Sequence, residues 1–98
     1  MAGRVNESDL TLFYKCVLAL ETEDECKAFF SDLCTIMELY AMAQRINIAE
    51  MLTNKVIYEK IVKNTGASTA TISRVNRSLK YGENGYMKML NRVKAEEE

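Results

Sequence analysis

The chain has 98 residues, of which 48% are apolar and 28% charged. This is the length of one domain and enough apolar content for a core, which excludes a disordered chain and a second catalytic domain. Proline is absent and glycine numbers 4, so helices joined by short turns are favoured over β-rich architectures. Because a domain of this size buries only about 60–65% of its unfolded surface, we expect an oligomer.

The residue types of common catalytic and metal sites are missing. Histidine, the commonest general base and metal ligand, is absent. Cys16, Cys26 and Cys34 form neither a C-x-x-C pair nor a repeated metal spacing, so we interpret them as reduced thiols. No stretch approaches the ~20 apolar residues of a membrane span. We therefore predict a cytoplasmic protein that is not an enzyme and binds neither a metal nor a membrane.

Charge is distributed unevenly along the chain. Residues 1–50 carry four bases and nine acids, a net charge of −5, whereas residues 51–98 carry nine bases and five acids, a net charge of +4. Three of those five acids end the chain, so residues 51–95 alone have a net charge of +7. Such a basic half suits a polyanionic partner, although a solvated lysine face has the same composition.

Three capping-box patterns predict helix starts in the first half, at Asn6–Asp9, Thr22–Glu25 and Thr35–Glu38. The first helix ends near Leu20 and the third near Thr53. The first two have apolar residues at helical spacing: Leu12, Phe13, Cys16, Val17 and Leu20, then Cys26, Phe29, Phe30 and Leu33. The third is apolar around much of its circumference, through Leu39, Met42, Ala43, Ile46, Ala49, Met51 and Leu52. This exceeds one packing face, so we place the helix at the centre of the fold or of a dimer.

Three shorter helices are predicted in the second half. The first runs from about Tyr58 to Lys63 and ends at Gly66, because glycine adopts the left-handed conformation readily. Ser68 caps the next, which runs to about Tyr81, and the last spans about 86–95. Their predicted inward residues are Tyr58, Ile61 and Val62; Ala67, Ile72, Val75 and Leu79; and Met87, Leu90 and Val93. The sequence therefore predicts an all-α domain of six helices over residues 1–98.

The segment 58–81 has the features of a helix-turn-helix in order: a short helix, a glycine turn and a second helix with one apolar side. The second helix begins with small side chains, which permit close approach to base edges and thymine methyls. We predict that DNA bases are approached by Ser68, Thr69, Ala70 and Ser73. Arg74, Arg77 and Lys80 are predicted to reach phosphates, or guanine in the case of arginine. A helical hairpin that only packs is the alternative for this spacing.

The stretch T-G-A-S-T-A-T-I-S-R-V-N-R-S-L-K over 65–80 resembles the Trp repressor superfamily, and the resemblance extends over 29–93. A closer resemblance, to the YerC/YecD family of Trp-repressor-like proteins of Gram-positive bacteria, covers almost the whole chain. It includes the motif around Tyr14, F-F-S-D-L-C-T-I from Phe29, A-M-A-Q-R from Ala41 and Y-G-E-N-G-Y from Tyr81. The resemblance implies an all-helical, intertwined homodimer, with dimerisation helices over about 8–53 and 86–95 and a protruding helix-turn-helix on each subunit.

The same resemblance places Thr35, Arg45 and Arg74 where the tryptophan-responsive repressor surrounds its bound amino acid, with the arginines sandwiching the indole. Val75 departs from that pattern, because the repressor has glycine there and the added side chain fills part of the pocket. We therefore expect no cofactor, with L-tryptophan or a similar effector as the alternative. Ile57 also departs from the relatives, which usually offer a Ser or Thr cap for the first helix of the motif.

Together these features predict a sequence-specific transcriptional regulator that binds a palindromic operator in double-stranded DNA as a homodimer. The alternative is a helical dimeric adaptor that binds a protein partner without DNA. An enzyme ranks third, because the chain has no phosphate-binding glycine loop and no nucleophile and base pair.

Overall fold

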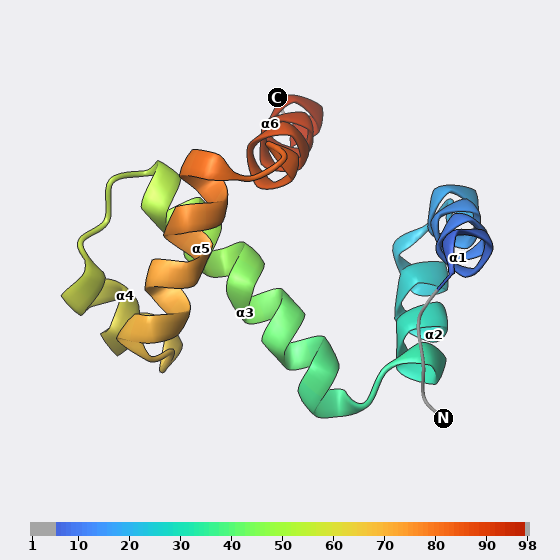
Figure 1. Cartoon of the computed structure of the whole chain (residues 1–98), viewed down its shortest axis with the longest axis horizontal. Coiled ribbons are helices and arrows are strands. Elements are labelled where there is room, and N and C mark those ends of the chain that lie inside the picture. The colour runs from blue at the N-terminus through green and yellow to red at the C-terminus, as the bar shows by residue number, and fades with distance from the viewer. Residues whose placement is uncertain (1–5, 98) are drawn as a thin grey trace. The chain divides into compact units, whose positions relative to one another are not determined.

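The computed structural model describes residues 6–97, which contain six α-helices and no strand. The helices are α1 (Glu7–Ala19), α2 (Glu23–Leu33), α3 (Ile36–Thr53), α4 (Tyr58–Thr65), α5 (Thr69–Tyr81) and α6 (Gly85–Glu97) (Figure 1). The predicted all-α architecture of six helices is confirmed. Only the ends differ: α4 continues to Thr65, and α6 begins at Gly85 and ends at Glu97.

The first compact unit ends at Ile36 and contains α1 and α2. The predicted caps at Asn6 and Thr22 are present, since Asn6 Oδ1 accepts a hydrogen bond from the Asp9 N–H and Thr22 Oγ1 accepts one from the Glu25 N–H, both at 3.1 Å. The Glu25 carboxylate, however, accepts from the Glu21 N–H at 2.8 Å, which is one residue before the cap. The reciprocal bond of this capping box is therefore shifted by one position.

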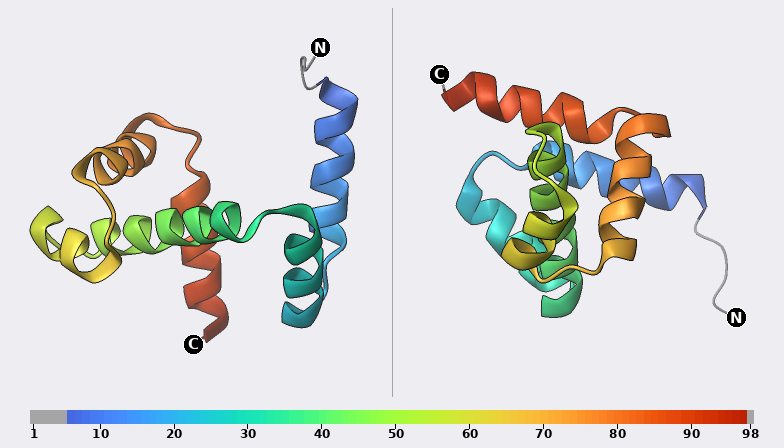
Figure 2. Two further views of the ribbon diagram at one scale, coloured as in Figure 1. Left: turned by 90° about the horizontal axis from the view of Figure 1, so that it is seen from below. Right: turned by 90° about the vertical axis from the view of Figure 1, so that its left-hand side faces the viewer.

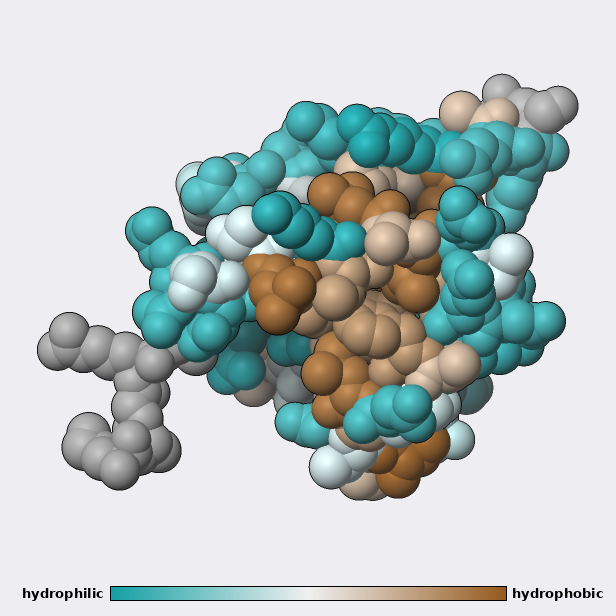
Figure 3. Space-filling model, turned by 90° about the vertical axis from the view of Figure 1, so that its right-hand side faces the viewer, coloured by the Kyte–Doolittle hydropathy of each residue, from teal (hydrophilic) through white to brown (hydrophobic). Residues whose placement is uncertain are grey.

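This unit encloses no core of its own, because none of the described residues of α1 or α2 is fully buried. Cys16, Val17 and Leu20 are half-buried, but Leu12 and Leu33, which the pattern predicts to point inward, are exposed. Apolar side chains are exposed over the middle of the face seen in Figure 3. Two helices are too few to cover each other's apolar surface.

The second unit begins at Met37 and contains α3, except for its first residue, and α4 to α6. α4 and α5 lie beside the C-terminal half of α3 (Figures 1 and 2). The core lies where these three helices meet and consists of Ile48, Ala49, Ile61, Ala67, Ile72 and Val75. Around it pack Met51, Leu52, Val56, Tyr58, Val62, Leu79, Tyr86 and Leu90. The predicted inward residues of α4 and α5 are thus confirmed.

The apolar residues of α3 and α6 are sorted differently from the prediction. On α3 only Ile48 and Ala49 are buried, although the apolar pattern does not single out Ile48. Ile46 on α3 is 50% exposed and Val93 on α6 is 52% exposed. On α6 Leu90 packs against the core as predicted, together with Tyr86, which the pattern does not single out. Much of the apolar surface of α3 therefore faces outward. Within residues 6–97 no helix has the length and apolar character needed to cross a bilayer.

Gly82 ends α5 by a close approach of backbone to backbone. Its N–H donates to the Ser78 carbonyl oxygen at 2.9 Å, and a Cβ on Gly82 would lie 2.5 Å from that same oxygen. A side chain at this position therefore requires the backbone to move.

We expect Gly82→Ala to lower the free energy of unfolding by about 1–3 kcal/mol, as overpacking of fixed atoms does. Gly85→Ala is the control, because a Cβ at Gly85 would have no atom within 4 Å and alanine is the better helix former. Urea unfolding of the two variants and the parent measures the difference. Equal stabilities of the two variants would contradict this account of Gly82.

Candidate nucleic-acid interface

The turn between α4 and α5 is held by a dense set of local hydrogen bonds. Gly66 adopts φ 73°, in the left-handed region predicted for it, and its N–H donates to the Val62 carbonyl oxygen at 2.8 Å. Thr65 Oγ1 donates to the Ile61 carbonyl oxygen at 2.7 Å and accepts from the Ala67 N–H at 3.1 Å. Ala67 is buried in the core. The turn therefore has one defined backbone path.

Ser68 starts α5 as predicted. Its Oγ accepts from the Thr71 N–H at 3.1 Å and donates to Thr71 Oγ1 at 3.1 Å. The side-chain cap satisfies one of the free N–H groups at the helix start. Because Ile72 and Val75 are buried, the opposite side of α5 is turned away from the core.

All seven predicted DNA-binding side chains lie on the exposed surface of α5 and its cap: Ser68, Thr69, Ala70, Ser73, Arg74, Arg77 and Lys80. Four of them line one shallow hollow of about 220 Å³, namely Ala70, Ser73, Arg74 and Arg77. Since α5 contains three bases and no acid, this surface combines small side chains with positive charge. Such a surface suits close approach to bases flanked by phosphates.

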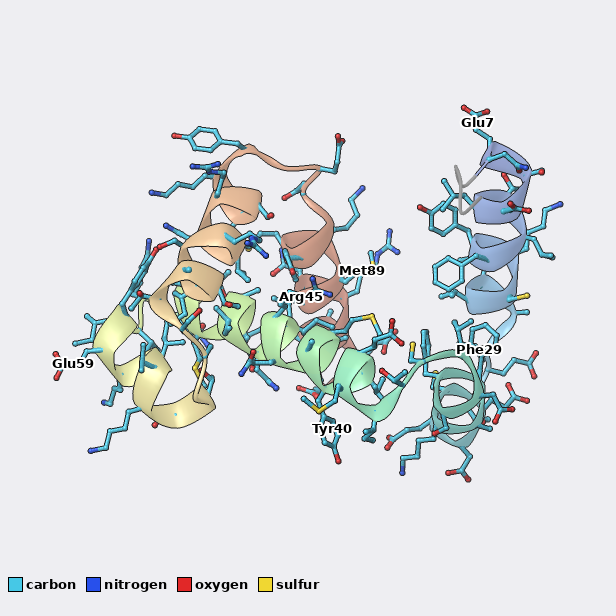
Figure 4. All side chains as sticks on the ribbon, turned by 60° about the horizontal axis from the view of Figure 1, so that its bottom comes forward. Glu7, Phe29, Tyr40, Arg45, Glu59 and Met89 are labelled. Carbon is cyan, nitrogen blue, oxygen red and sulfur yellow. The ribbon has the colours of Figure 1, made fainter. Side chains whose placement is uncertain are left out.

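The neighbouring helix extends the positive surface. Lys60 and Lys63 of α4 are exposed, whereas the residue-by-residue prediction was confined to α5 and its cap. Glu59 is the single acid against five bases in residues 58–81, and it points away from α3 (Figure 4). The net charge of +7 over residues 51–95 includes these two lysines, so the sequence indicates them as part of a basic surface.

The predicted effector residues are placed on separate parts of the chain. Thr35 belongs to the first unit and immediately precedes α3, whereas Arg45 and Arg74 are exposed in the second unit. Figure 4 shows Arg45 on the side of α3 that faces α5 and α6, opposite Tyr40. Val75 is 2% exposed and packs in the core with Ile48 and Ala49. The Val75 side chain therefore fills the space where the tryptophan-responsive repressor has only a glycine.

Within residues 6–97 neither Arg45 nor Arg74 forms an ion pair. An ion pair in this range joins Lys27 to Glu23 on α2 at 3.3 Å. No group of three His, Cys, Asp or Glu side chains in the same range is arranged to hold a metal ion.

The sequence pattern of the Trp repressor protein family matches residues 8–94. The chain belongs to the Trp repressor family. This match spans all of α2 to α5 and most of α1 and α6, so the helix-turn-helix lies within the family's shared region.

Individual relatives of this Trp repressor family member agree with the assignment. The chain is 46% identical over 94 residues to the uncharacterized protein YerC of Bacillus subtilis (strain 168), covering 96% of this chain and 90% of that protein. The crystal structure of a candidate Trp repressor from Staphylococcus aureus superposes with a TM-score of 0.87 at 40% identity, over 91% and 89% of the two chains. A TrpR-like protein from Eubacterium eligens gives 0.83 at 45% identity, over 90% of each chain. The predicted resemblance to the Trp repressor family and the all-helical fold are thereby confirmed, and the intertwined homodimer stays a prediction.

α4 begins without a side-chain cap, as the departure at Ile57 predicts. Ile57 occupies the cap position with φ −74° and ψ 152°, but no side chain bonds the free N–H groups there. Ile57 is 66% exposed, so its replacement removes little buried apolar surface.

We expect Ile57→Ser to raise the free energy of unfolding by about 0.5–2 kcal/mol, because the backbone already has the conformation that a serine cap requires. Ile57→Ala is the control, since it removes the same side chain without adding a hydrogen-bond acceptor. Chemical denaturation of both variants separates the two effects. A serine variant no more stable than the alanine variant would show that α4 gains nothing from a cap.

Proposed function

We propose that this Trp repressor family member is a sequence-specific transcriptional regulator that binds a palindromic operator as a homodimer. The observation that carries the proposal is the outward face of α5, where small polar side chains and three bases are exposed on a helix whose other side is fixed in the core. In a helix-turn-helix protein this is the face that enters the major groove.

The residues of α5 divide into two roles by their position along the helix. Thr69 and Ser73 lie one turn apart near its start, where base edges are closest, and Ala70 offers a methyl group to thymine. Arg74 and Arg77 reach phosphates or guanine from the same hollow. Lys80 lies in the last turn and contacts the phosphate backbone only. Base contacts thus give specificity, and the lysine gives affinity.

The homodimer is supported by the apolar surface that one chain leaves uncovered. The second unit has a hollow of about 680 Å³ lined mostly by apolar side chains. They include Ile46, Tyr86, Met89, Leu90 and Val93. The first unit exposes apolar side chains on α1 and α2 as well. Apolar surface exposed in each unit is typical of an interface, so we assign its cover to a second copy of the chain.

Operator binding on this proposal needs no tryptophan. Support comes from Val75, which occupies core volume beside Arg74, and from the turn, whose hydrogen bonds are made by the chain alone. Arg45 and Arg74 then serve structure or phosphate binding. The protein acts in the cytoplasm, where bacterial DNA is found, and catalyses no reaction.

A dimeric adaptor is the second candidate, favoured by the same apolar hollow, which could accept a helix of another protein. The two functions differ in salt dependence. DNA binding weakens steeply as salt rises, because fewer counterions are released favourably, whereas apolar docking does not.

The dimer predicts a sedimentation mass of about 22 kDa, twice the 11.2 kDa of one chain. Met89→Glu places a charge in the apolar hollow and is expected to yield monomer, because a buried unpaired charge is strongly destabilising. Lys88→Glu is the control, since it adds the same side chain on the same helix outside the hollow. Analytical ultracentrifugation at micromolar concentration tests both, and a stable monomer of the parent chain would overturn the dimer.

The DNA proposal predicts that Thr69→Leu changes which sequence is preferred, each lost base contact being worth about 1–3 kcal/mol. Lys80→Ala weakens all sequences alike and lowers the salt slope by about one unit, because one phosphate contact is lost. Lys94→Ala, in the last turn of α6, is the matched control and is expected to have neither effect.

Competition binding with randomised duplexes, with and without tryptophan, measures preference and salt slope together. Two α5 helices in a dimer read half-sites about 34–36 Å apart, so the selected sequences are expected to be approximate palindromes. No selection above background would favour the adaptor instead. A sequence preference that appears only with tryptophan would overturn the proposal that operator binding needs no effector.

A further inference from the structure

Gln44 of α3 makes a hydrogen bond that joins the central helix to the helix-turn-helix. Its Nε2 donates to the Thr65 carbonyl oxygen at 3.1 Å, in a part-buried position. The two residues are 21 positions apart in the sequence, whereas the bonds made by the Thr65 and Ser68 side chains stay within four positions. The bond therefore fixes tertiary placement rather than local conformation.

The acceptor of this bond, the Thr65 carbonyl oxygen, lies at the turn that connects α4 to α5. Thr65 is the last residue of α4, and carbonyl groups at a helix end have no partner within the helix. Gly66 turns the chain immediately afterwards, and the start of α5 follows three residues later. A shift of Thr65 is thus transmitted directly to Thr69.

Gln44 and the core together give two points of attachment. Gln44 lies one helical turn before Ile48, on the same side of α3, so the bond extends the line of contact between α3 and the motif. The apolar contact at Ile48 is non-directional, whereas a hydrogen bond depends strongly on angle. The bond from Gln44 therefore adds a directional contact to the non-directional packing between α3 and the motif.

The bond lies on a different side of α3 from the basic Arg45. Gln44 lines a hollow of about 380 Å³ together with Tyr40, Asn47 and Asn64, and Figure 4 shows Tyr40 opposite Arg45. This anchor is thus separate from the predicted effector residues.

We propose that Gln44 is a positioning residue that sets the angle of the helix-turn-helix on α3, and thereby the fit of Thr69 and Ser73 to base edges. The inference rests on the proposed DNA-binding function. It places the control of specificity partly on a residue that touches no DNA.

The test compares side chains of similar length that keep or lose the donor. Gln44→Met removes it, Gln44→Glu replaces it with an acceptor, and Gln44→Lys restores a donor. Asn47→Met is the matched control, because Asn47 lines the same hollow on the same helix and the bond to Thr65 comes from Gln44. The readout is the ratio of affinity for the selected duplex to affinity for random duplex, with the salt slope and melting temperature recorded alongside.

We expect Gln44→Met and Gln44→Glu to lower this ratio about tenfold, the loss of roughly one base contact, with an unchanged salt slope. Gln44→Lys is expected to recover most of the ratio, and Asn47→Met to keep it. If either donor-free variant folds and retains the parent ratio, the proposal is overturned; if neither folds, a Lys variant without the parent ratio overturns it. A parent protein with no sequence preference would instead contradict the proposed function.

Amide hydrogen exchange in the absence of DNA tests the positioning role of Gln44 independently of the proposed DNA-binding function. Loss of the anchor is expected to speed exchange of the Ala67 N–H about tenfold or more, while the Ser68 cap at Thr71 stays protected. Unchanged exchange at Ala67 in Gln44→Met would overturn the positioning role whatever DNA binding shows.

Discussion

Six apolar side chains where α3 meets α4 and α5 hold the helix-turn-helix to the rest of the chain. Each fully buried aliphatic side chain contributes about 1.5–3 kcal/mol, so this contact is small by the standards of a domain. Its effect on geometry is nevertheless large. Because Ile72 and Val75 point into it, the rotation of α5 about its own axis is fixed, and Thr69, Ser73 and Arg77 must lie on the opposite side.

The smallness of that core also explains why so much apolar surface remains outside it. α1 and α2 bury none of their described side chains completely, and α3 buries two. In the proposed homodimer, a second copy would cover this surface, add the stability that one chain lacks and bring a second α5 into the assembly. The proposed dimerisation and the proposed recognition of a palindrome thus have the same cause, which is that one chain buries too little apolar surface by itself.

Orientation of the motif depends on polar contacts that the core cannot supply. Gly66 and Thr65 define the path of the turn, and Gln44 ties that turn to α3. Val75 fills core volume in the same cluster as Ile48 and Ala49. These contacts support the proposal of a regulator that binds DNA without an effector.

The caps at Asn6, Thr22 and Ser68 and the left-handed turn at Gly66 follow from the sequence alone, because each depends on residues within one helical turn. Which apolar face meets a neighbour depends instead on packing between helices. Ile48 is 0% exposed and Ile46 on the same helix is 50% exposed, although they are the same residue type. Helical periodicity shows which residues share a face, but only packing selects that face, and only folding brings Gln44 to Thr65.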